Sequence, residues 1–340
     1  MSKVLQQKNW PGRAQVVGFT LVAVALVLPF LLPPYRNYDF SLMFIYGTAI
    51  LGLTMLTGAS GQISLAQGTF VGVGAYVVAI AVVKLGMPLW VGVLVAVGST
   101  TVMGFAIGLL ASRLNGLYLA LLTLALAIIF APVIKRFPEE TGGASGLLIP
   151  QPRVPEGWPL ADDQLHYLFA LSMLILAWLL TQGVLSRRPG RALYACQDDP
   201  LAAAAMGINV PLTRAIAFAW AGAVAGLAGA GYVVVVGFVS PESFPLLLSV
   251  AFLAGLVVGG ARSPWGALLG AAYVQFVPLY TGRISDSLAG VVYGISLVVV
   301  LLLLPGGLAS IARRLSQRNG RNRFRVRRAS SGGRRLPSKL

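Results

Sequence analysis

The sequence contains very little of the chemistry that enzymes use. Its 340 residues include one cysteine, Cys196, and one histidine, His166. A single cysteine cannot form a disulfide or a thiolate metal cluster within one chain, and a catalytic triad or zinc site would depend on the single histidine. The phosphate-binding motif Gly-x-x-x-x-Gly-Lys-Ser/Thr is also missing from the sequence. These shortages argue against an enzyme, and any ATP-driven process would need another chain to hydrolyse the ATP.

Charged residues are scarce as well. They make up 11% of the chain, whereas hydrophobic residues make up 57% and the mean hydropathy is +0.80. A soluble domain has about a quarter charged residues because its surface must meet water. Most of the surface of this protein therefore faces something other than water. The chain also has 40 glycines and 20 prolines, two residue types that are more frequent in transmembrane helices than in soluble ones.

Apolar segments recur along most of the chain. A helix needs about twenty apolar residues to cross a hydrocarbon core of about 30 Å. We predict about ten transmembrane or re-entrant helices, near residues 14–34, 41–58, 68–84, 88–112, 116–134, 165–186, 215–238, 247–261, 264–280 and 287–305. The first segment lacks a small-residue cleavage site and is expected to be an uncleaved span. The segments 247–261 and 264–280 are short, so they form either a re-entrant pair or tightly turned helices.

The positions of lysine and arginine predict the orientation, because basic residues collect on the cytoplasmic side. The N-terminal segment 1–13, the loop 187–214 and the tail 312–340 are basic and are expected in the cytoplasm. The loop 135–164 has five acidic residues and is expected outside. Ten crossings from a cytoplasmic N-terminus place all four regions correctly. We therefore predict an all-α integral membrane protein with a membrane domain over 14–311 and both termini in the cytoplasm.

The tail is strongly basic. From Arg313 onwards it has eleven basic residues and no acidic one. It is expected to be disordered and to lie against anionic membrane lipid, which attracts each basic residue by about 1 kcal/mol. Nucleic-acid binding through released counterions is the less favoured alternative.

Ionisable side chains inside a span would indicate a proton or ion relay. Here they all lie near predicted span ends, which weakens the case for a proton-coupled carrier; they are Arg36, Asp39, Lys84, Arg113, Glu242, Arg262 and Asp286.

An uncharged polar segment, 58–68, lies between two predicted spans. It contains Gln62, Ser64 and Gln67 together with several glycines. Irregular polar backbone at membrane depth is tolerated only where protein or a water-filled cavity covers it. The three side chains therefore either line a pathway, or the segment is an ordinary cytoplasmic turn whose glycines allow close helix packing.

The loop 187–214 contains one predicted short helix. An aspartate can cap its first turn and Pro200 fits the first position, because proline lacks only an N–H that is unpaired there. Alanines continue the helix and a glycine ends it. The helix either docks in a groove of a soluble partner or simply connects two spans. The residues that define it are Asp198, Asp199, Ala202, Ala203 and Gly207.

Taken together, these segments resemble the permease subunits of branched-chain amino acid ABC importers, the LivM branch. The resemblance runs from about residue 40 to 305. It is carried by 61–68 with 72–76, by 141–147, by 190–209 with 217–218 and 225–230, and by 240–244 and 259–266.

The resemblance implies a multi-pass subunit of the plasma (inner) membrane. Its partners would be a second permease, two cytoplasmic ATPases and an extracytoplasmic substrate-binding protein, and no cofactor is implied. ATP-driven alternating access would translocate branched-chain amino acids, the helix from Asp199 to Gly207 would dock on an ATPase, and Gln62, Ser64 and Gln67 would line the pathway.

One residue departs from the pattern of such permeases. Leu201 stands where they often have a glutamate before two alanines, which removes one polar contact. The alternatives are the same architecture carrying urea, amides or other amino acids, or a stand-alone secondary carrier or channel.

Overall fold

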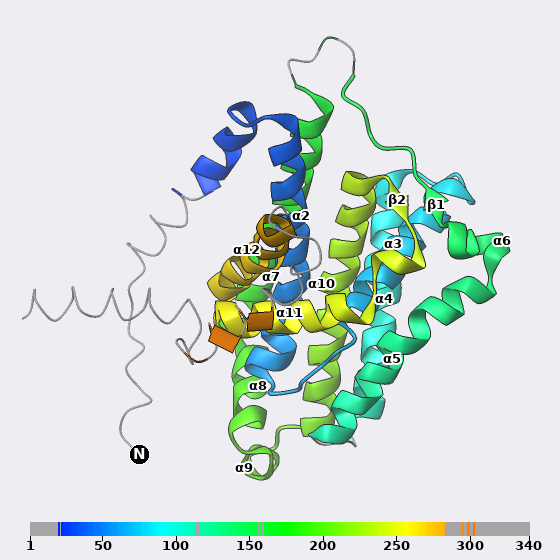
Figure 1. Cartoon of the computed structure of the whole chain (residues 1–340). Helices are drawn as coiled ribbons and strands as arrows, with labels where there is room; N and C mark the ends of the chain where they lie inside the picture. The colour runs from blue at the N-terminus through cyan, green and yellow to red at the C-terminus, as the bar shows by residue number, and fades with distance from the viewer. Residues whose placement is uncertain are drawn as a thin grey trace, which may run out of the picture.

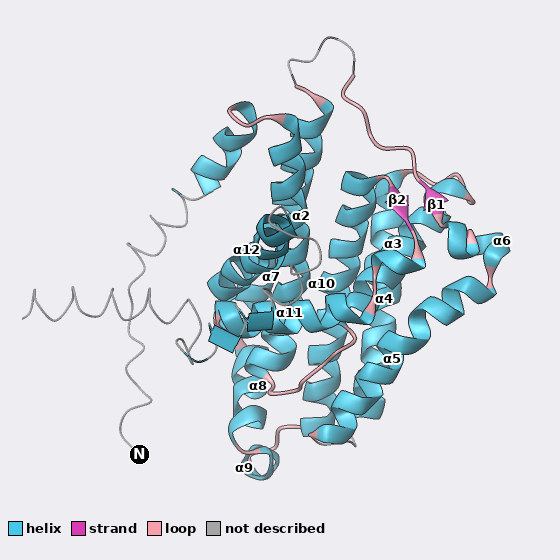
Figure 2. Cartoon of the chain, in the orientation of Figure 1, coloured by secondary structure: helices cyan, strands magenta, loops and turns pink. Residues whose placement is uncertain are grey.

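The computed structural model describes residues 20, 22–112, 114, 116–155, 157, 160–282, 294, 295, 298, 299 and 302. These residues are mostly helical, with two short strands near one end of the molecule (Figure 2). The terminal segments 1–13 and 312–340, and most of the predicted span 287–305, lie outside the described residues, as does much of the span 14–34.

The helices follow in chain order as α2 (Pro34–Leu53), α3 (Gln67–Val83), α4 (Leu89–Ala111), α5 (Leu117–Arg136), α6 (Pro138–Thr141), α7 (Asp162–Ser186), α8 (Arg188–Asp198), α9 (Pro200–Ala205), α10 (Val210–Val236), α11 (Leu246–Gly259) and α12 (Pro264–Gly282). A π-helical segment over Thr54–Ala59 extends α2. Short 3-10 turns lie at Leu28–Phe30, Gly143–Ser145 and Pro241–Ser243. Strands β1 (Leu147–Leu148) and β2 (Phe238–Val239) pair antiparallel, with Leu147 opposite Val239.

Six helices of the described part are long and apolar enough to cross a membrane. They are Pro34–Ala59, α4, α5, α7, α10 and Pro241–Gly259, and they coincide with six of the predicted spans. The apolar helix α3 is shorter, at 17 residues. The prediction of an all-α membrane protein is confirmed, while the ten crossings and the cytoplasmic termini stay predictions.

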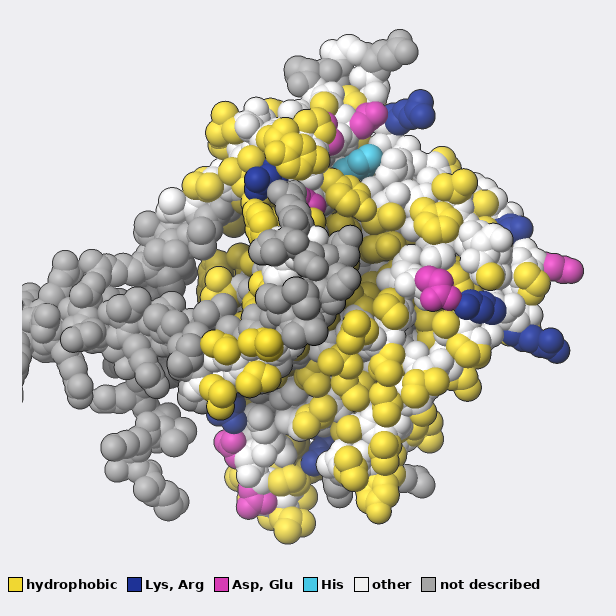
Figure 3. Space-filling view, in the orientation of Figure 1, with side chains coloured by type: hydrophobic (Ala, Val, Ile, Leu, Met, Phe, Trp, Pro, Cys, Tyr) yellow, Lys and Arg dark blue, Asp and Glu magenta, His cyan; other side chains and the backbone are white. Residues whose placement is uncertain are grey.

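The centre of the bundle is formed by α2 and α10. Within an 18-residue apolar window of each span, 78% of the residues are buried in the α2 span and 72% in α10, but only 28%, 22% and 28% in α4, α5 and α7. Glycines bring α10 close to its neighbours: a Cβ at Gly222 would overlap the backbone of Thr100 in α4, and one at Gly229 would overlap Val71 in α3. Small residues allow such close approach between membrane helices. Hydrophobic side chains cover much of the outer face where α5 and α11 lie (Figure 3).

Helices α11 and α12 form a hairpin closed by a short turn at 260–263. Its two arms touch through glycines, because Gly255 and Gly259 face the backbone of Gly270 and Gly266. In Figure 1, α11 runs across the direction of α2 and α10. The two short predicted segments are therefore tightly packed helices.

The second predicted span begins earlier than hydropathy predicts. Helix α2 starts at Pro34 instead of near residue 41, since proline fits the first turn of a helix. The polar stretch 35–39 is thereby helical, and within it Asn37 is 0% and Asp39 9% exposed. Asp39 is thus a buried residue inside a 26-residue apolar helix, which its place beside the apolar run did not predict.

Candidate functional site

The loop between α2 and α3 turns its polar side chains inwards. Gln62, Ser64 and Gln67 are 4%, 0% and 0% exposed, whereas Ile63 between them is 50% exposed. The bend begins at Gly61, whose φ of 71° favours glycine. The structure thus brings the three predicted pathway residues together inside the bundle.

The two glutamines connect this loop to the central helices. Gln67 Nε2 donates to the carbonyl oxygens of Ala49 in α2 (2.8 Å) and Ala221 in α10 (3.5 Å). Gln62 Nε2 donates to Ser60 Oγ (2.7 Å) and to the carbonyl oxygen of Arg214 (3.4 Å). Within the described residues, both Oε1 atoms are buried without a hydrogen-bond donor. A buried acceptor left unpaired costs about 1–3 kcal/mol, so both oxygens can gain by accepting a hydrogen bond.

Two hydroxyl groups hold the backbone of the loop. Leu65 N donates to Thr123 Oγ1 of α5 (3.0 Å), and Gly68 N donates to Ser249 Oγ of α11 (2.9 Å). Ser64 Oγ itself accepts from Ala66 N (3.3 Å). Thr123 and Ser249 were not predicted, since their only signal in the sequence is a single hydroxyl residue within an apolar run. The loop is therefore held by α5, α10 and α11 as well as by its own glycines.

The loop 187–214 contains two helices where the sequence predicted one. Helix α8 buries Leu193 and Cys196, which are both 1% exposed, against the bundle. Helix α9 follows after Asp199 and projects from the lower end of the molecule in Figure 1. Its cap is Asp199, whose Oδ1 accepts from Leu201 N (2.9 Å) and Ala202 N (3.1 Å). Asp198 instead lies 3.9 Å from Arg262 Nη2 in an exposed ion pair.

The outer surface of α9 is apolar and exposed. Leu201 is 84% and Met206 72% exposed, whereas Ala203 on the inner side is fully buried. Ala202 is exposed. Gly207 ends the helix at φ 83°, and no described atom lies within 4 Å of the place that a Cβ would take there. Of the predicted docking residues, Asp199, Ala202, Ala203 and Gly207 therefore belong to α9 or its two ends, whereas Asp198 is the last residue of α8.

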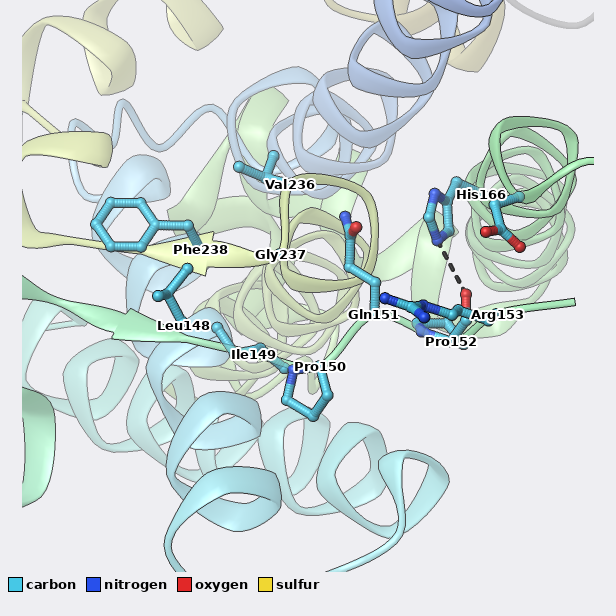
Figure 4. A pocket seen from close by; sticks show the side chains of 11 residues that line it. Leu148, Ile149, Pro150, Gln151, Pro152, Arg153, His166, Val236, Gly237 and Phe238 are labelled. Carbon is cyan, nitrogen blue, oxygen red and sulfur yellow. Dashed lines mark hydrogen bonds between the residues drawn. The ribbon is translucent and has the colours of Figure 1, made fainter.

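A pocket of about 570 Å³ lies at the other end of the molecule, beside β1 and β2 (Figure 4). Several of its polar groups are used within the protein. Gln151 Nε2 donates to the carbonyl oxygens of Val234 and Val235 (3.4 and 2.9 Å), and His166 Nε2 lies 3.2 Å from the carbonyl oxygen of Pro152. The hydrogen bonds of Gln151 thus attach the loop after β1 to the end of α10.

No metal centre is suggested by the part of the chain that the structure describes, which holds no group of three or more His, Cys, Asp or Glu side chains able to bind an ion.

Comparisons with known proteins identify the family to which the chain is similar. The family model described as "Branched-chain amino acid transport system / permease component" matches residues 39–301. The high-affinity branched-chain amino acid transport system permease protein LivM of Escherichia coli (strain K12) is 29% identical over 88% of this chain and 76% of its own length. LivH of the same system and strain is 25% identical over 77% of this chain and 90% of its own length.

A relative with a different name matches over more of the chain. The autoinducer 2 import system permease protein LsrC of Escherichia coli O9:H4 (strain HS) is 27% identical over 92% of this chain and 95% of its own length. No solved structure gives a significant match.

Proposed function

This chain belongs to the family of branched-chain amino acid transport permeases and is a multi-pass permease subunit of an ABC transporter, and we propose that its cargo is branched-chain, hydrophobic amino acids. Permeases of this family lack an ATPase site of their own, so separate ATPase subunits would supply the energy. The similarity to LivM over most of both chains supports this cargo.

The observation that carries the proposed mechanism is the exposed apolar helix α9. Large apolar side chains at 84% and 72% exposure, Leu201 and Met206, are suited to a groove on a soluble partner. We assign this groove to an ATPase subunit. Position 201 is a leucine and not a glutamate, so the main contribution of this helix to docking would be an apolar contact.

Contacts connect α9 to the buried loop. Helix α8, which precedes α9, lies against the loop, since a Cβ at Gly61 would be 3.0 Å from Gln197 Cγ. Gln62 in turn bonds to the carbonyl oxygen of Arg214 in the first turns of α10. ATPase movement at α9 would therefore reach the loop through α8 and α10. The ATPase can shift the equilibrium between the inward and outward states of the permease only by binding one of them more tightly than the other.

The loop is proposed to line the pathway. Gln62, Ser64 and Gln67 stand where α2, α3 and α10 meet, and the two unpaired amide oxygens offer acceptors to a polar cargo or to water. The pathway would be completed by a second permease. With α9 in the cytoplasm, the loop 135–164 lies outside, where an extracytoplasmic binding protein delivers the cargo.

The relative LsrC favours a second candidate cargo. Its name specifies autoinducer 2 import, and it matches 92% of this chain. The same fold and the same α9 docking would serve that cargo, so the cargo has to be measured directly.

Purification from the native membrane in mild detergent tests the proposal. We expect a second permease and ATPases with phosphate-binding loops to co-purify. In proteoliposomes with the cognate binding protein, ATP should drive uptake of leucine, isoleucine and valine but not of urea or autoinducer 2. Recovery of this chain alone, with uptake that does not depend on ATP, would contradict the proposal and favour a self-sufficient carrier.

A further inference from the structure

Helix α2 contains a buried carboxyl group that the proposed mechanism does not use. Asp39 is 9% exposed, and no residue of the described chain forms a hydrogen bond or ion pair with it. It lies five residues from the start of α2 at Pro34, about 7 Å along the helix axis. Ionisable groups within membrane spans are costly and are normally retained for a function. Asp39 therefore calls for a partner of opposite charge.

Two basic groups at this end of the described chain have other contacts. Arg36, one turn earlier in α2, donates from Nη1 to the Tyr280 hydroxyl (3.3 Å) and lies over the ring of Tyr35 (5.7 Å from guanidinium carbon to ring centroid). Lys135 pairs with Glu242. Each of these basic groups thus has another contact.

Two tyrosines of α2, Tyr38 and Tyr46, are near Asp39 along the helix, and Tyr232 lies on the neighbouring helix α10. Tyr46 is seven residues further along α2, which places it on the same face of the helix. Helices α2 and α10 touch where a Cβ at Gly231 would lie 3.4 Å from Ile45 Cγ1, and Tyr46 and Tyr232 are the next residues on the two helices. Tyr38, Tyr46 and Tyr232 are close enough to influence one another electrostatically, and Tyr38 is also in range of Asp39.

Further rings extend this group towards α11. The ring centroid of Tyr46 lies 5.4 Å from that of Phe252, and the centroid of Tyr232 lies 5.0 Å from that of Phe244. The two tyrosines are half-buried, while both phenylalanines are buried. The two tyrosines thus present their rings towards the interior of the bundle, where each packs on a buried phenylalanine.

We propose that Asp39 binds the α-ammonium group of an amino acid in transit, with the apolar side chain of the cargo against the half-buried Tyr46 and Tyr232. A carboxylate forms strong hydrogen bonds to an ammonium group, and tyrosine faces attract cations. Helix α2 begins at the end opposite α9 (Figure 1), so this subsite lies towards the outer end of the helix bundle. The inference rests on the proposed function and restricts the cargo to molecules with a cationic amine next to an apolar group.

The test compares Asp39→Asn and Asp39→Glu in the reconstituted complete transporter with its binding protein. We expect Asp39→Asn to lower leucine uptake about tenfold or more, because the charge-assisted bonds are lost, and Asp39→Glu to retain most of it. ATPase activity stimulated by the loaded binding protein should persist in both. Glu242→Gln, an exposed carboxylate change at the same end, is the control and should transport normally. Leucine uptake by Asp39→Asn within about twofold of the unaltered protein would overturn the inference, since that bond contributes most of the expected effect.

Labelling of the unaltered transporter keeps the inference testable if Asp39→Asn does not assemble. A carbodiimide that modifies carboxyl groups should label Asp39, and millimolar leucine should protect it. Equal labelling with and without leucine, or none in either sample, would contradict an accessible ammonium site. If ATPases co-purify and uptake is ATP-driven while Asp39 is irrelevant, the inference fails and the proposed function stands. If no ATPase co-purifies, the proposed function itself fails.

Discussion

Helix α9 and the loop 60–66 are both short connections between spans, yet they satisfy their polar groups in opposite ways. In α9 the free backbone amides of the first turn are paired locally. Asp199 accepts from the amides of Leu201 and Ala202, two and three positions further along the chain. In the loop the polar groups are paired at long range, with Ala49, Ala221 and other residues of α2, α5, α10 and α11. The first element leaves apolar side chains exposed, and the second buries polar ones. Exposure therefore suits α9 for a partner protein, and burial suits the loop for the pathway.

The largest effect is expected from added bulk next to the buried loop. A Cβ at Gly58 would overlap the carbonyl of Ala261, so Gly58→Val should cost about 3 kcal/mol or more through overpacking. We expect little folded protein by size-exclusion chromatography in detergent. Gly98→Val is the matched control, because no described atom lies within 4 Å of a Cβ at Gly98 in α4. Normal yield of Gly58→Val would contradict the close contact between loop and hairpin.

A change at the end of α9 should instead remove transport and spare the fold. Gly207→Glu adds a charged side chain at a position whose φ is 83°. A residue other than glycine is strained by about 1–2 kcal/mol in this left-handed conformation. Uptake in proteoliposomes should fall by about tenfold or more, as expected from loss of a docking contact, while the subunit stays in the membrane. Gly207→Asn tolerates this backbone conformation and adds no charge, so it should retain more activity. Normal uptake by Gly207→Glu would remove the docking role.

Gln67→Leu separates a pathway role from a packing role. It removes hydrogen bonds that contribute about 0.6 kcal/mol each within membranes, so the thermal midpoint in detergent should drop only slightly. Uptake should fall by several-fold if Gln67 meets the cargo. Thr181→Val, which removes the acceptor of the Trp220 Nε1 bond between α7 and α10 (3.2 Å), is the matched control. Equal uptake by both variants would show that Gln67 serves packing alone.

The smallest effect is expected from the cap of α9. Asp199→Ala should destabilise this helix by about 1 kcal/mol. The amides of Leu201 and Ala202 should then exchange with deuterium about five times faster, the factor that corresponds to this free energy. Asp198→Ala is the control, since Asp198 forms only an exposed ion pair. Unchanged exchange in Asp199→Ala would show that the cap does not stabilise α9.

The same contrast explains how much the sequence could predict. The start and the end of α9 both follow from local signals, because Pro200, the alanines and Gly207 act on their own backbone. The hydrogen bond from Gln67 to Ala221 joins residues 154 positions apart, and no local pattern specifies it. Helix α8 was missed because its burial at Leu193 and Cys196 depends on the bundle beside it.

Asp39 was missed for a related reason. Hydropathy places the start of the span after the polar stretch 35–39, although proline at 34 lets the helix begin there. Burial of Asp39 depends on neighbouring helices that its own segment does not reveal. The apolar spans themselves were predictable, because length and composition alone determine them.

Cross-linking from α9 tests the central claim most directly. Leu201→Cys gives a thiol at an 84% exposed position, and the native Cys196 does not interfere, because burial raises the pKa of its thiol and makes it unreactive. With a short bifunctional thiol–amine reagent, the purified complex should yield one product that contains this chain and an ATPase subunit, and its amount should change when ATP binds. Cross-linking only to lipid or to other permease chains, with or without ATP, would contradict α9 as the element that couples ATP hydrolysis to transport.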